Sequence, residues 1–182
     1  MKNIFTVIFV FSAFIAKAQE EVLKSLDEKT AFYSNVSQQI WDLAELGYLE
    51  TNSSALLQKT LSDAGFTVKA GVAEIPTAFM AEYGSGKPVI GIMAEFDALP
   101  GVSQKAVPFR EAVVEGGAGH ACGHHLFGTA SVAAGIAAMD WMKANNIQGT
   151  IRVYGTPAEE GGGGKVYMAK SGIMDDVDAM LH

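Results

Sequence analysis

The sequence predicts an α/β fold, a three-layer αβα sandwich in which helices cover both faces of one sheet. Two observations lead to this prediction: strand-like apolar runs alternate with helical patterns, and polar clusters follow several of those runs. In sheets of this kind the chemistry lies in loops beyond the carboxyl ends of the strands. The 182 residues are enough for one domain with a hydrophobic core.

The helical segments are recognised by their spacing and by their end signals. Residues 20–49 carry apolar side chains at three- and four-residue spacing, which predicts a long amphipathic helix. A second helix is expected over residues 52–65, with a polar cap region at its start and Gly65 at its end. Residues 128–145 are rich in Ala and Gly and predict a helix that packs closely on the sheet, and a short helix is expected over 165–171.

Short apolar runs predict the strands of the sheet: residues 66–69, 78–83, 89–94, 150–154 and 179–181. The run 89–94 shows no polar alternation, as expected for a strand that is covered on both faces. Residues 102–119 have weak periodicity and several glycines, and they predict a long loop.

The N-terminus predicts a secretory signal peptide over residues 1–18. Lys2 precedes a short apolar run, and Ala16-Lys17-Ala18 gives a small-x-small cleavage pattern. The alternative, a transmembrane anchor, needs about 20 apolar residues, more than this run offers. We therefore expect an exported protein, periplasmic or secreted, whose mature part over residues 19–182 does not contact a membrane. The net charge of −7, with no basic stripe, argues against a nucleic-acid partner.

Two carboxylates follow the apolar run 89–94. Glu95 and Asp97 point to the same side if the chain continues extended, because side chains alternate along a strand. A solvated strand end followed by a turn would give the same pattern, so this cluster alone does not define a site.

The second cluster, residues 119–125, holds three of the four histidines and the only cysteine of the chain. A thiolate and an imidazole are good ligands for zinc and similar ions, which makes Cys122 and His124 candidate metal ligands. Gly123 between them allows the backbone to turn so that both side chains face one ion. The alternative is a loop in which the histidines are incidental.

The third cluster begins at Pro157 and contains Glu159 and Glu160 before four consecutive glycines. One glutamate can hold a metal while its neighbour acts as general base toward a water, although a flexible acidic loop would share this composition. A phosphate-binding P-loop is disfavoured because Gly164-Lys165 is followed by Val166, where that motif needs Ser or Thr. His182 follows the last apolar run. It becomes a candidate site residue only because the end of a further strand would place it near the other three clusters.

Taken together, these clusters resemble the M20 amidohydrolases, and within that family the p-aminobenzoyl-glutamate hydrolase group. The resemblance spans residues 20–182 and is carried by four motifs in the family's order: Glu95-Phe96-Asp97-Ala98-Leu99-Pro100, His120-Ala121-Cys122-Gly123-His124, Pro157-Ala158-Glu159-Glu160-Gly161-Gly162-Gly163 and Asp178-Ala179-Met180-Leu181-His182.

The resemblance implies a role for each candidate site residue. Cys122, His124, Glu160 and His182 would be metal ligands, with the Cys122 thiolate replacing the bridging carboxylate of related peptidases. Glu159 would be the general base. Asp97 would orient a ligand or the base.

The sequence departs from the family pattern at three places. His125 stands where many relatives have Asp, and Glu95 stands where dipeptidase-like relatives have a ligating His, which favours the cysteine type of site. Family members also continue beyond the position of His182. The resemblance therefore implies the N-terminal part of a catalytic domain of the zinc-exopeptidase type, without the lid and dimerisation domain and without a last histidine ligand, and we expect little activity from these 182 residues alone.

The implied function is hydrolysis of an amide bond in an N-acyl or aminobenzoyl amino acid or a dipeptide-like substrate. One or two ions, Mn²⁺ or Zn²⁺, would polarise the carbonyl and activate a water for Glu159 to deprotonate. The expected partners are a small-molecule amide substrate and, for the full-length protein, further subunits in a homo- or hetero-oligomer. The alternatives are a non-catalytic metal- or ligand-binding descendant of such an enzyme and a thiol hydrolase with Cys122 as nucleophile and His124 or His125 as base.

Overall fold

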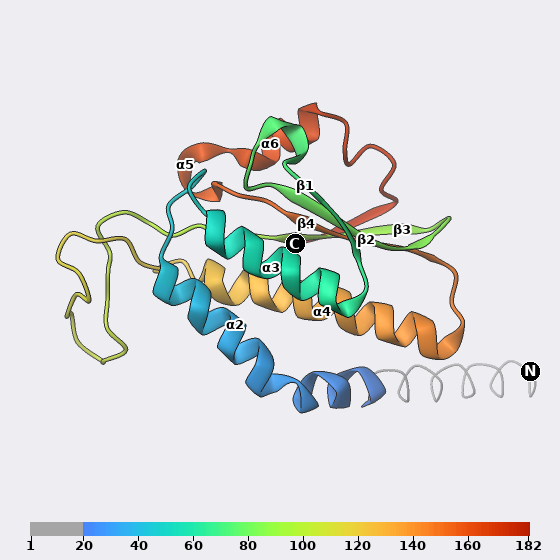
Figure 1. The fold of residues 1–182 in the computed structure, drawn as a ribbon, viewed down its shortest axis with the longest axis horizontal. Helices are drawn as coiled ribbons and strands as arrows, with labels where there is room; N and C mark the ends of the chain where they lie inside the picture. The colour runs from blue at the N-terminus through green and yellow to red at the C-terminus, as the bar shows by residue number, and fades with distance from the viewer. Residues whose placement is uncertain (1–19) are drawn as a thin grey trace, which may run out of the picture.

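The structure is a computed structural model that describes residues 20–182. Its centre is a five-stranded sheet with the strand order β1-β2-β4-β3-β5 (Figure 1). The strands are β1 (Thr67–Ala70), β2 (Phe79–Ser85), β3 (Val89–Ala94), β4 (Gly149–Gly155) and β5 (Ala179–Leu181).

The sheet is mixed, and its parallel half positions the polar clusters. β3 pairs in parallel with β4 and β5, whereas β1–β2 and β2–β4 are antiparallel. Ala94 lies opposite Gly155, so β3 and β4 end at the same level. Ile92 lies opposite Leu181, so the end of β5 is close by. The residues that follow these three strands therefore emerge at one edge of the sheet, as the sequence predicts.

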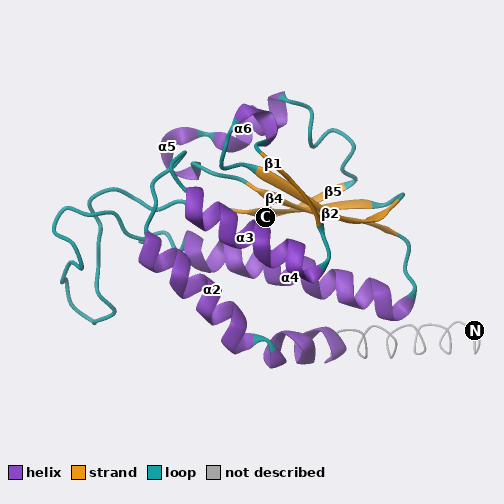
Figure 2. Ribbon diagram, in the orientation of Figure 1, coloured by secondary structure: helices purple, strands orange, loops and turns teal. Residues whose placement is uncertain are grey.

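Three helices cover one face of the sheet: α2 (Thr30–Leu43), α3 (Thr51–Ala64) and α4 (His124–Asn145) (Figure 2). The main hydrophobic core lies between them and the strands. α4 approaches the sheet closely because it carries glycine at its contacts. A Cβ added to Gly128 would lie 2.3 Å from the carbonyl oxygen of Glu95, and one added to Gly135 would lie 2.5 Å from the Val153 side chain.

The other face has a thinner cover. A 3₁₀ turn, η1 (Val72–Glu74), and the short helix α6 (Gly164–Lys170) lie there, with a second small core that includes Tyr154 and Met168. The predicted three-layer arrangement is confirmed, with unequal outer layers.

The predicted elements are confirmed with three corrections. The helix predicted over residues 20–49 is interrupted at Lys29 and ends at Leu43, where Ala44 adopts a left-handed conformation. α4 begins at His124, four residues before the predicted start, because Gly123 with φ 87° caps it. The segment Glu159–Gly162 forms a short helical turn, α5, that the sequence did not predict.

Residues 102–119 form the predicted long loop, which is closed at its neck. The amide N–H of Leu99 donates to the carbonyl oxygen of Gly119, and the amide of Gly119 donates to the carbonyl oxygen of Leu99, both at 3.0 Å. Among the described residues, no helix is long and apolar enough to cross a membrane. The predicted signal peptide lies outside the described residues.

Candidate metal centre

His124 is held by two buried carboxylates that follow β3. Its Nδ1 lies 2.9 Å from Asp97 Oδ1, and its Nε2 lies 2.9 Å from Glu95 Oε2. The side chains of Glu95 and Asp97 are 6% and 0% exposed, so these contacts lie almost entirely outside bulk water. The predicted common orientation of Glu95 and Asp97 is confirmed, because both side chains reach the same imidazole.

The charges in this group stabilise one another. The hydrogen bond to Asp97 raises the pKa of His124 above its ordinary value, which favours the imidazolium. Burial acts to raise the pKa of Asp97, but hydrogen bonds from His124 and from the Glu160 amide outweigh it, so the Asp97 pKa is lowered. Glu95 follows the same pattern, because its hydrogen bonds from Lys165 and His182 outweigh burial and lower its pKa.

The turn that carries Glu159 and Glu160 follows β4 and is fixed from several sides. Ala158 has φ 54°, a left-handed conformation that costs energy for a residue with a Cβ. Its amide N–H donates to Glu50 Oε1 at 2.8 Å, and Glu50 is completely buried. The Glu160 amide donates to Asp97 Oδ2, also at 2.8 Å.

The segment between α2 and α3 closes over the same turn. The Tyr48 hydroxyl donates to the carbonyl oxygen of Gly162 at 2.6 Å. A Cβ added to Gly47 would lie 3.0 Å from the Ala158 Cβ, so only glycine fits there without a shift. The residues around Glu159 are therefore positioned by contacts that are far away in sequence.

Cys122 lies at the outer side of the site and is exposed. A hydrogen bond to Glu160 raises the pKa of its thiol to about 11, and the charges of Glu160 and Glu159 add to this shift. In the absence of a cation the thiol is therefore protonated at neutral pH. A bound metal ion would reverse this balance, because coordination deprotonates a thiol.

His182 reaches the site from the end of β5. Its Nε2 lies 2.7 Å from Glu95 Oε1, and its ring packs 5.2 Å from that of Phe127. The same Glu95 oxygen contacts the Lys165 ammonium group at the start of α6. Glu95 thus accepts hydrogen bonds from Lys165 and His182 and forms an ion pair with His124.

The structure brings most of the predicted site residues to one edge of the sheet. The donor atoms of Glu95, His124 and Glu159 lie within 4.8 Å of one another, the only group of three such ligand types found among the described residues. Of the four predicted metal ligands, only His124 belongs to this group; Cys122, Glu160 and His182 lie outside it. Glu159 Oε2 lies 3.8 Å from His124 Nε2. Oε1 of Glu160 is buried and has no hydrogen-bond partner in the part of the chain that the structure describes.

This donor set fits a divalent cation. Imidazole and carboxylate are ligand types that zinc takes in proteins, and carboxylates also suit manganese. The unpartnered Glu160 oxygen is a buried acceptor that a cation would satisfy. Converging carboxylates repel one another, and a cation between them would remove that cost.

The sequence alone assigns no site role to three residues that the structure places here. In the sequence Glu95 stands out mainly as a departure from the family pattern, yet it is the acceptor at the centre of the group. In the sequence, Lys165 is used only to argue against a P-loop, whereas in the structure its ammonium group contacts Glu95. Glu50 borders a segment that is predicted to be helical, and no local pattern marks its contact with Ala158, 108 residues away.

The match to Peptidase family M20/M25/M40 covers residues 91–182, the part of the chain that contains all the clusters described above. The chain belongs to this family. Over 150 residues it is 47% identical to one of the subunits of p-aminobenzoyl-glutamate hydrolase from Escherichia coli K12, a match that covers 82% of this chain and 31% of that protein.

Solved structures show the same fold. The YXEP protein of Bacillus subtilis, a dinuclear metal-binding peptidase of the M20 family, is 28% identical with a TM-score of 0.65, over 83% of this chain and 42% of that chain. The aminobenzoyl-glutamate utilization protein of Klebsiella pneumoniae has a TM-score of 0.64 at 17% identity, over 88% of this chain and 45% of that chain. The present chain thus spans less than half the length of each of these relatives.

Proposed function

We propose that this chain supplies the metal centre and general base of an amide hydrolase that acts on aminobenzoyl or other N-acyl amino acids. The observation that carries the proposal is the convergence of Glu95, His124 and Glu159 at the edge of a sheet with the M20 fold. The 47% identity to the p-aminobenzoyl-glutamate hydrolase protein supports the substrate class, and an oligomer is supported because that relative is one of several subunits. The predicted signal sequence supports export.

The proposed ligands are Cys122, His124, Glu160 and His182, with Mn²⁺ or Zn²⁺ as the ion. When bound, one or two such ions polarise an amide carbonyl and acidify a water. The protein's own contribution begins with Asp97, which orients His124 through Nδ1 and the Glu160 backbone through its amide. Asp97 thus fixes two of the proposed ligands at once.

Glu159 is the proposed general base. Its side chain is 43% exposed, so a substrate and a water can approach it, and its carboxylate lies beside His124. Glu159 would take a proton from the attacking water and return it to the nitrogen of the leaving amine. The left-handed turn at Ala158 and the Glu50 contact hold the base in place.

The geometry disfavours Cys122 as a nucleophile. A thiol nucleophile needs a lowered pKa and an adjacent base, whereas the pKa of Cys122 is raised to about 11 by its hydrogen bond to Glu160. The two ring nitrogens of His124, one of the two candidate bases, contact the carboxylates of Glu95 and Asp97 rather than Cys122.

Metal content and hydrolysis test the proposal separately. The purified protein should hold near-stoichiometric manganese or zinc in elemental analysis, and Cys122→Ala and His124→Ala should lose most of it. Asp63→Asn, on the exposed face of α3, is the matched control and should keep its metal. Absence of metal from the unaltered protein, in the longest natural form of its gene product, would overturn the assignment.

The second assay follows release of p-aminobenzoate from p-aminobenzoyl-glutamate by that same natural form. Glu159→Gln should lower kcat by about 10²- to 10⁴-fold while keeping its metal, because only the base is removed. Full metal occupancy without hydrolysis of this or other N-acyl amino acids would favour the non-catalytic alternative.

A further inference from the structure

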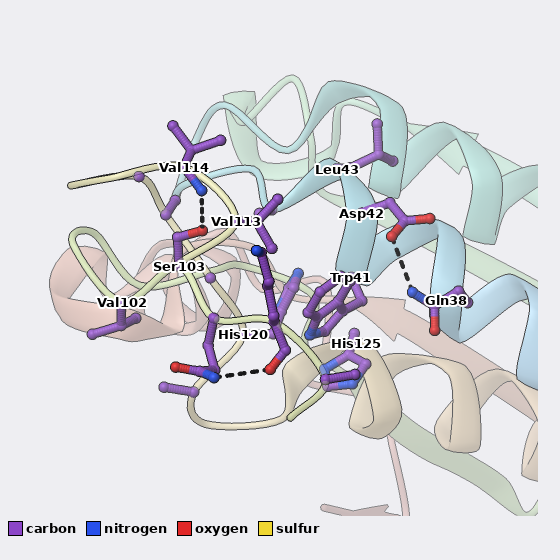
Figure 3. A pocket seen from close by; sticks show the side chains of 18 of the residues that line it. Gln38, Trp41, Asp42, Leu43, Val102, Ser103, Val113, Val114, His120 and His125 are labelled. Carbon is purple, nitrogen blue, oxygen red and sulfur yellow. Dashed lines mark hydrogen bonds between the residues drawn. The ribbon is translucent and has the colours of Figure 1, made fainter. Parts of the chain in front are cut away.

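The candidate metal centre has different neighbours on its two sides. Next to α2 lies a cavity of about 730 Å³, whose walls are the C-terminal half of α2, the 102–119 loop and the first residues of α4 (Figure 3). Among the described residues that line this cavity, none belongs to the group of Glu95, His124 and Glu159. On the side of α6, by contrast, Lys165 reaches into the centre and contacts Glu95 directly.

Lys165 is the only lysine or arginine that contacts a carboxylate of the centre in the described part of the chain. These carboxylates are Glu95, Asp97, Glu159 and Glu160, and every other described ion pair of a lysine or arginine involves a different acidic residue. Converging carboxylates repel one another, and an ammonium group among them offsets part of that repulsion. Lys165 therefore has the same favourable effect on these carboxylates that a metal ion would have.

Glu95 connects Lys165 with the proposed metal ligands. Its Oε2 lies 2.9 Å from His124 Nε2. Its Oε1 contacts the Lys165 ammonium group and lies 2.7 Å from His182 Nε2. An ion held by His124 would bring a double positive charge next to the carboxylate that already binds the ammonium group. Like charges at such short range in a partly buried site repel strongly, so the two cations disfavour one another.

Of the two partners in this ion pair, Lys165 is the one that can move. Its side chain is 25% exposed, whereas that of Glu95 is 6% exposed. The backbone of Glu95 is held under α4, because a Cβ added to Gly128 would lie 2.3 Å from its carbonyl oxygen. A lysine, by contrast, has a flexible four-carbon stem and a strongly hydrated ammonium group. The ammonium group can therefore pass into solvent while Glu95 stays in place.

The backbone of Lys165 is anchored beside the turn that carries the proposed base. α6 starts at Gly164, where an added Cβ would lie 2.0 Å from the carbonyl oxygen of Pro157. Only glycine allows the start of the helix to pack so closely on the segment that leads to Glu159. A displacement of Lys165 thus involves its side chain alone, and the tethered ammonium group can return to Glu95 when an ion leaves.

We infer that Lys165 is an internal competitor for the metal ion: its ammonium group and a divalent cation bind Glu95 alternately, and the cation displaces the ammonium group into solvent. The inference rests on the metal centre of the proposed function. It makes Lys165 a residue that lowers the affinity of the centre for its ion. A lysine that only fixed the fold would have the opposite effect, because its removal would loosen Glu95 and weaken ion binding.

The sign of this effect is measured by calorimetric titration of Mn²⁺ and of Zn²⁺ into the longest natural form of the gene product. Lys165→Met removes the charge and keeps much of the side-chain volume, and it should tighten ion binding about tenfold, equivalent to ~1.4 kcal/mol. Lys165→Arg keeps the charge and should not tighten binding. Lys59→Met, which breaks an exposed ion pair with Asp63 on α3, is the matched control and should leave the affinity unchanged.

A second pair of variants tests whether the competition is for Glu95. In a Glu95→Gln background the contested negative charge is gone, so Lys165→Met should change the affinity by less than about twofold. The unfolding transition of every variant is measured first. Glu95→Gln combined with Lys165→Met leaves no unpaired buried charge at this position, so this double variant should be more stable than Lys165→Met alone.

Lysine labelling of the unaltered protein gives a measurement that does not depend on any variant. Acetic anhydride is applied with and without saturating Zn²⁺, and the acetylated lysines are quantified by mass spectrometry. Acetylation of Lys165, relative to that of Lys59 in the same sample, should rise at least about threefold with the ion, as expected when a partly buried ion pair is broken. Removal of the ion with a chelator should restore the slower reaction.

The results separate this inference from the proposed function. Ion binding that is unchanged or weakened in folded Lys165→Met, or acetylation of Lys165 that does not rise with Zn²⁺ bound, would overturn the inference and leave the metal centre intact. Failure of the unaltered protein and of every variant to bind either ion would overturn the metal centre itself, and the inference with it.

Discussion

The two halves of the candidate metal centre are built differently. Asp97, Glu95 and His124 form a buried half in which each side chain is fixed by protein hydrogen bonds. Cys122, Glu159 and His182 form an exposed half, and the side chains of Glu159 and His182 are 43% and 55% exposed. The buried half keeps its shape without an ion, whereas the exposed half gains a fixed arrangement only when something binds to it.

The largest effect is expected where the buried half is broken. Asp97→Ala removes the partner of His124 and the acceptor of the Glu160 amide, and breaking such a buried pair should cost about 3–5 kcal/mol of the free energy of unfolding. Urea unfolding of the metal-free protein measures this loss. Glu159→Gln is the matched control from the exposed half and should change the stability by less than about 0.5 kcal/mol. Equal losses in the two variants would show that the halves do not differ.

The reactivity of Cys122 tests the exposed half. With its pKa raised to about 11, the thiol of the metal-free protein should react with iodoacetamide at pH 8 about ten- to a hundredfold more slowly than an unperturbed cysteine. Because the hydrogen bond to Glu160 is the main cause, Glu160→Gln should speed the reaction. Alkylation of the unaltered protein at the rate of a free cysteine peptide would contradict the raised pKa.

Glu50 is a further buried carboxylate, and it holds the turn that carries the proposed base Glu159. Burial raises the pKa of Glu50, so the folded state holds its proton more tightly than the unfolded state. The corresponding stability is present at low pH and is lost as the pH rises through the folded pKa. Glu50→Gln removes this dependence, by about 1.4 kcal/mol for each unit by which the folded pKa exceeds the unfolded one.

The measurement is the difference in free energy of unfolding between pH 4.5 and pH 8, compared for the unaltered protein and Glu50→Gln. The other titrating groups contribute equally to both proteins, so the comparison isolates Glu50. An identical pH dependence in the two proteins would mean that Glu50 is ionised in the fold at no cost.

The smallest effect is expected for His182. His182→Ala should change the stability of the metal-free protein by less than about 0.5 kcal/mol, because the ring is more than half exposed. The same variant should weaken manganese or zinc binding, since a proposed ligand is lost. A large loss of stability would show that His182 contributes to the folded state as the residues of the buried half do.

Much of the fold could be predicted because local patterns coincide with the tertiary structure. β3 occupies the predicted residues 89–94, because a buried parallel strand is a continuous apolar run. The predicted end of the first helix was wrong: residues 44–50 continue the helical spacing, but they bend away to contact Ala98 and Ala158. Tertiary contacts of this kind leave no periodic signal in the sequence.

The sequence predicts which residue types make up the site, but it does not predict which of them are hydrogen-bonded to one another. The clusters around Asp97, Cys122 and Glu159 concentrate rare ligand residues, and the parallel strands bring them to one edge. The central position of Glu95 could not be predicted, because it depends on Lys165 and His182, 70 and 87 residues further along the chain. Roles within the cluster remain predictions for the metal and activity experiments.

The backbone pair between Leu99 and Gly119 isolates the 102–119 loop from the metal-centre residues that follow it. Since the paired backbone at the neck sets the position of His120 to His124, the loop beyond it can gain or lose residues at small entropic cost without moving the metal ligands. The same loop forms a wall of the cavity next to α2. A change in the length of this loop can therefore alter the size of the cavity while the neighbouring metal centre keeps its geometry.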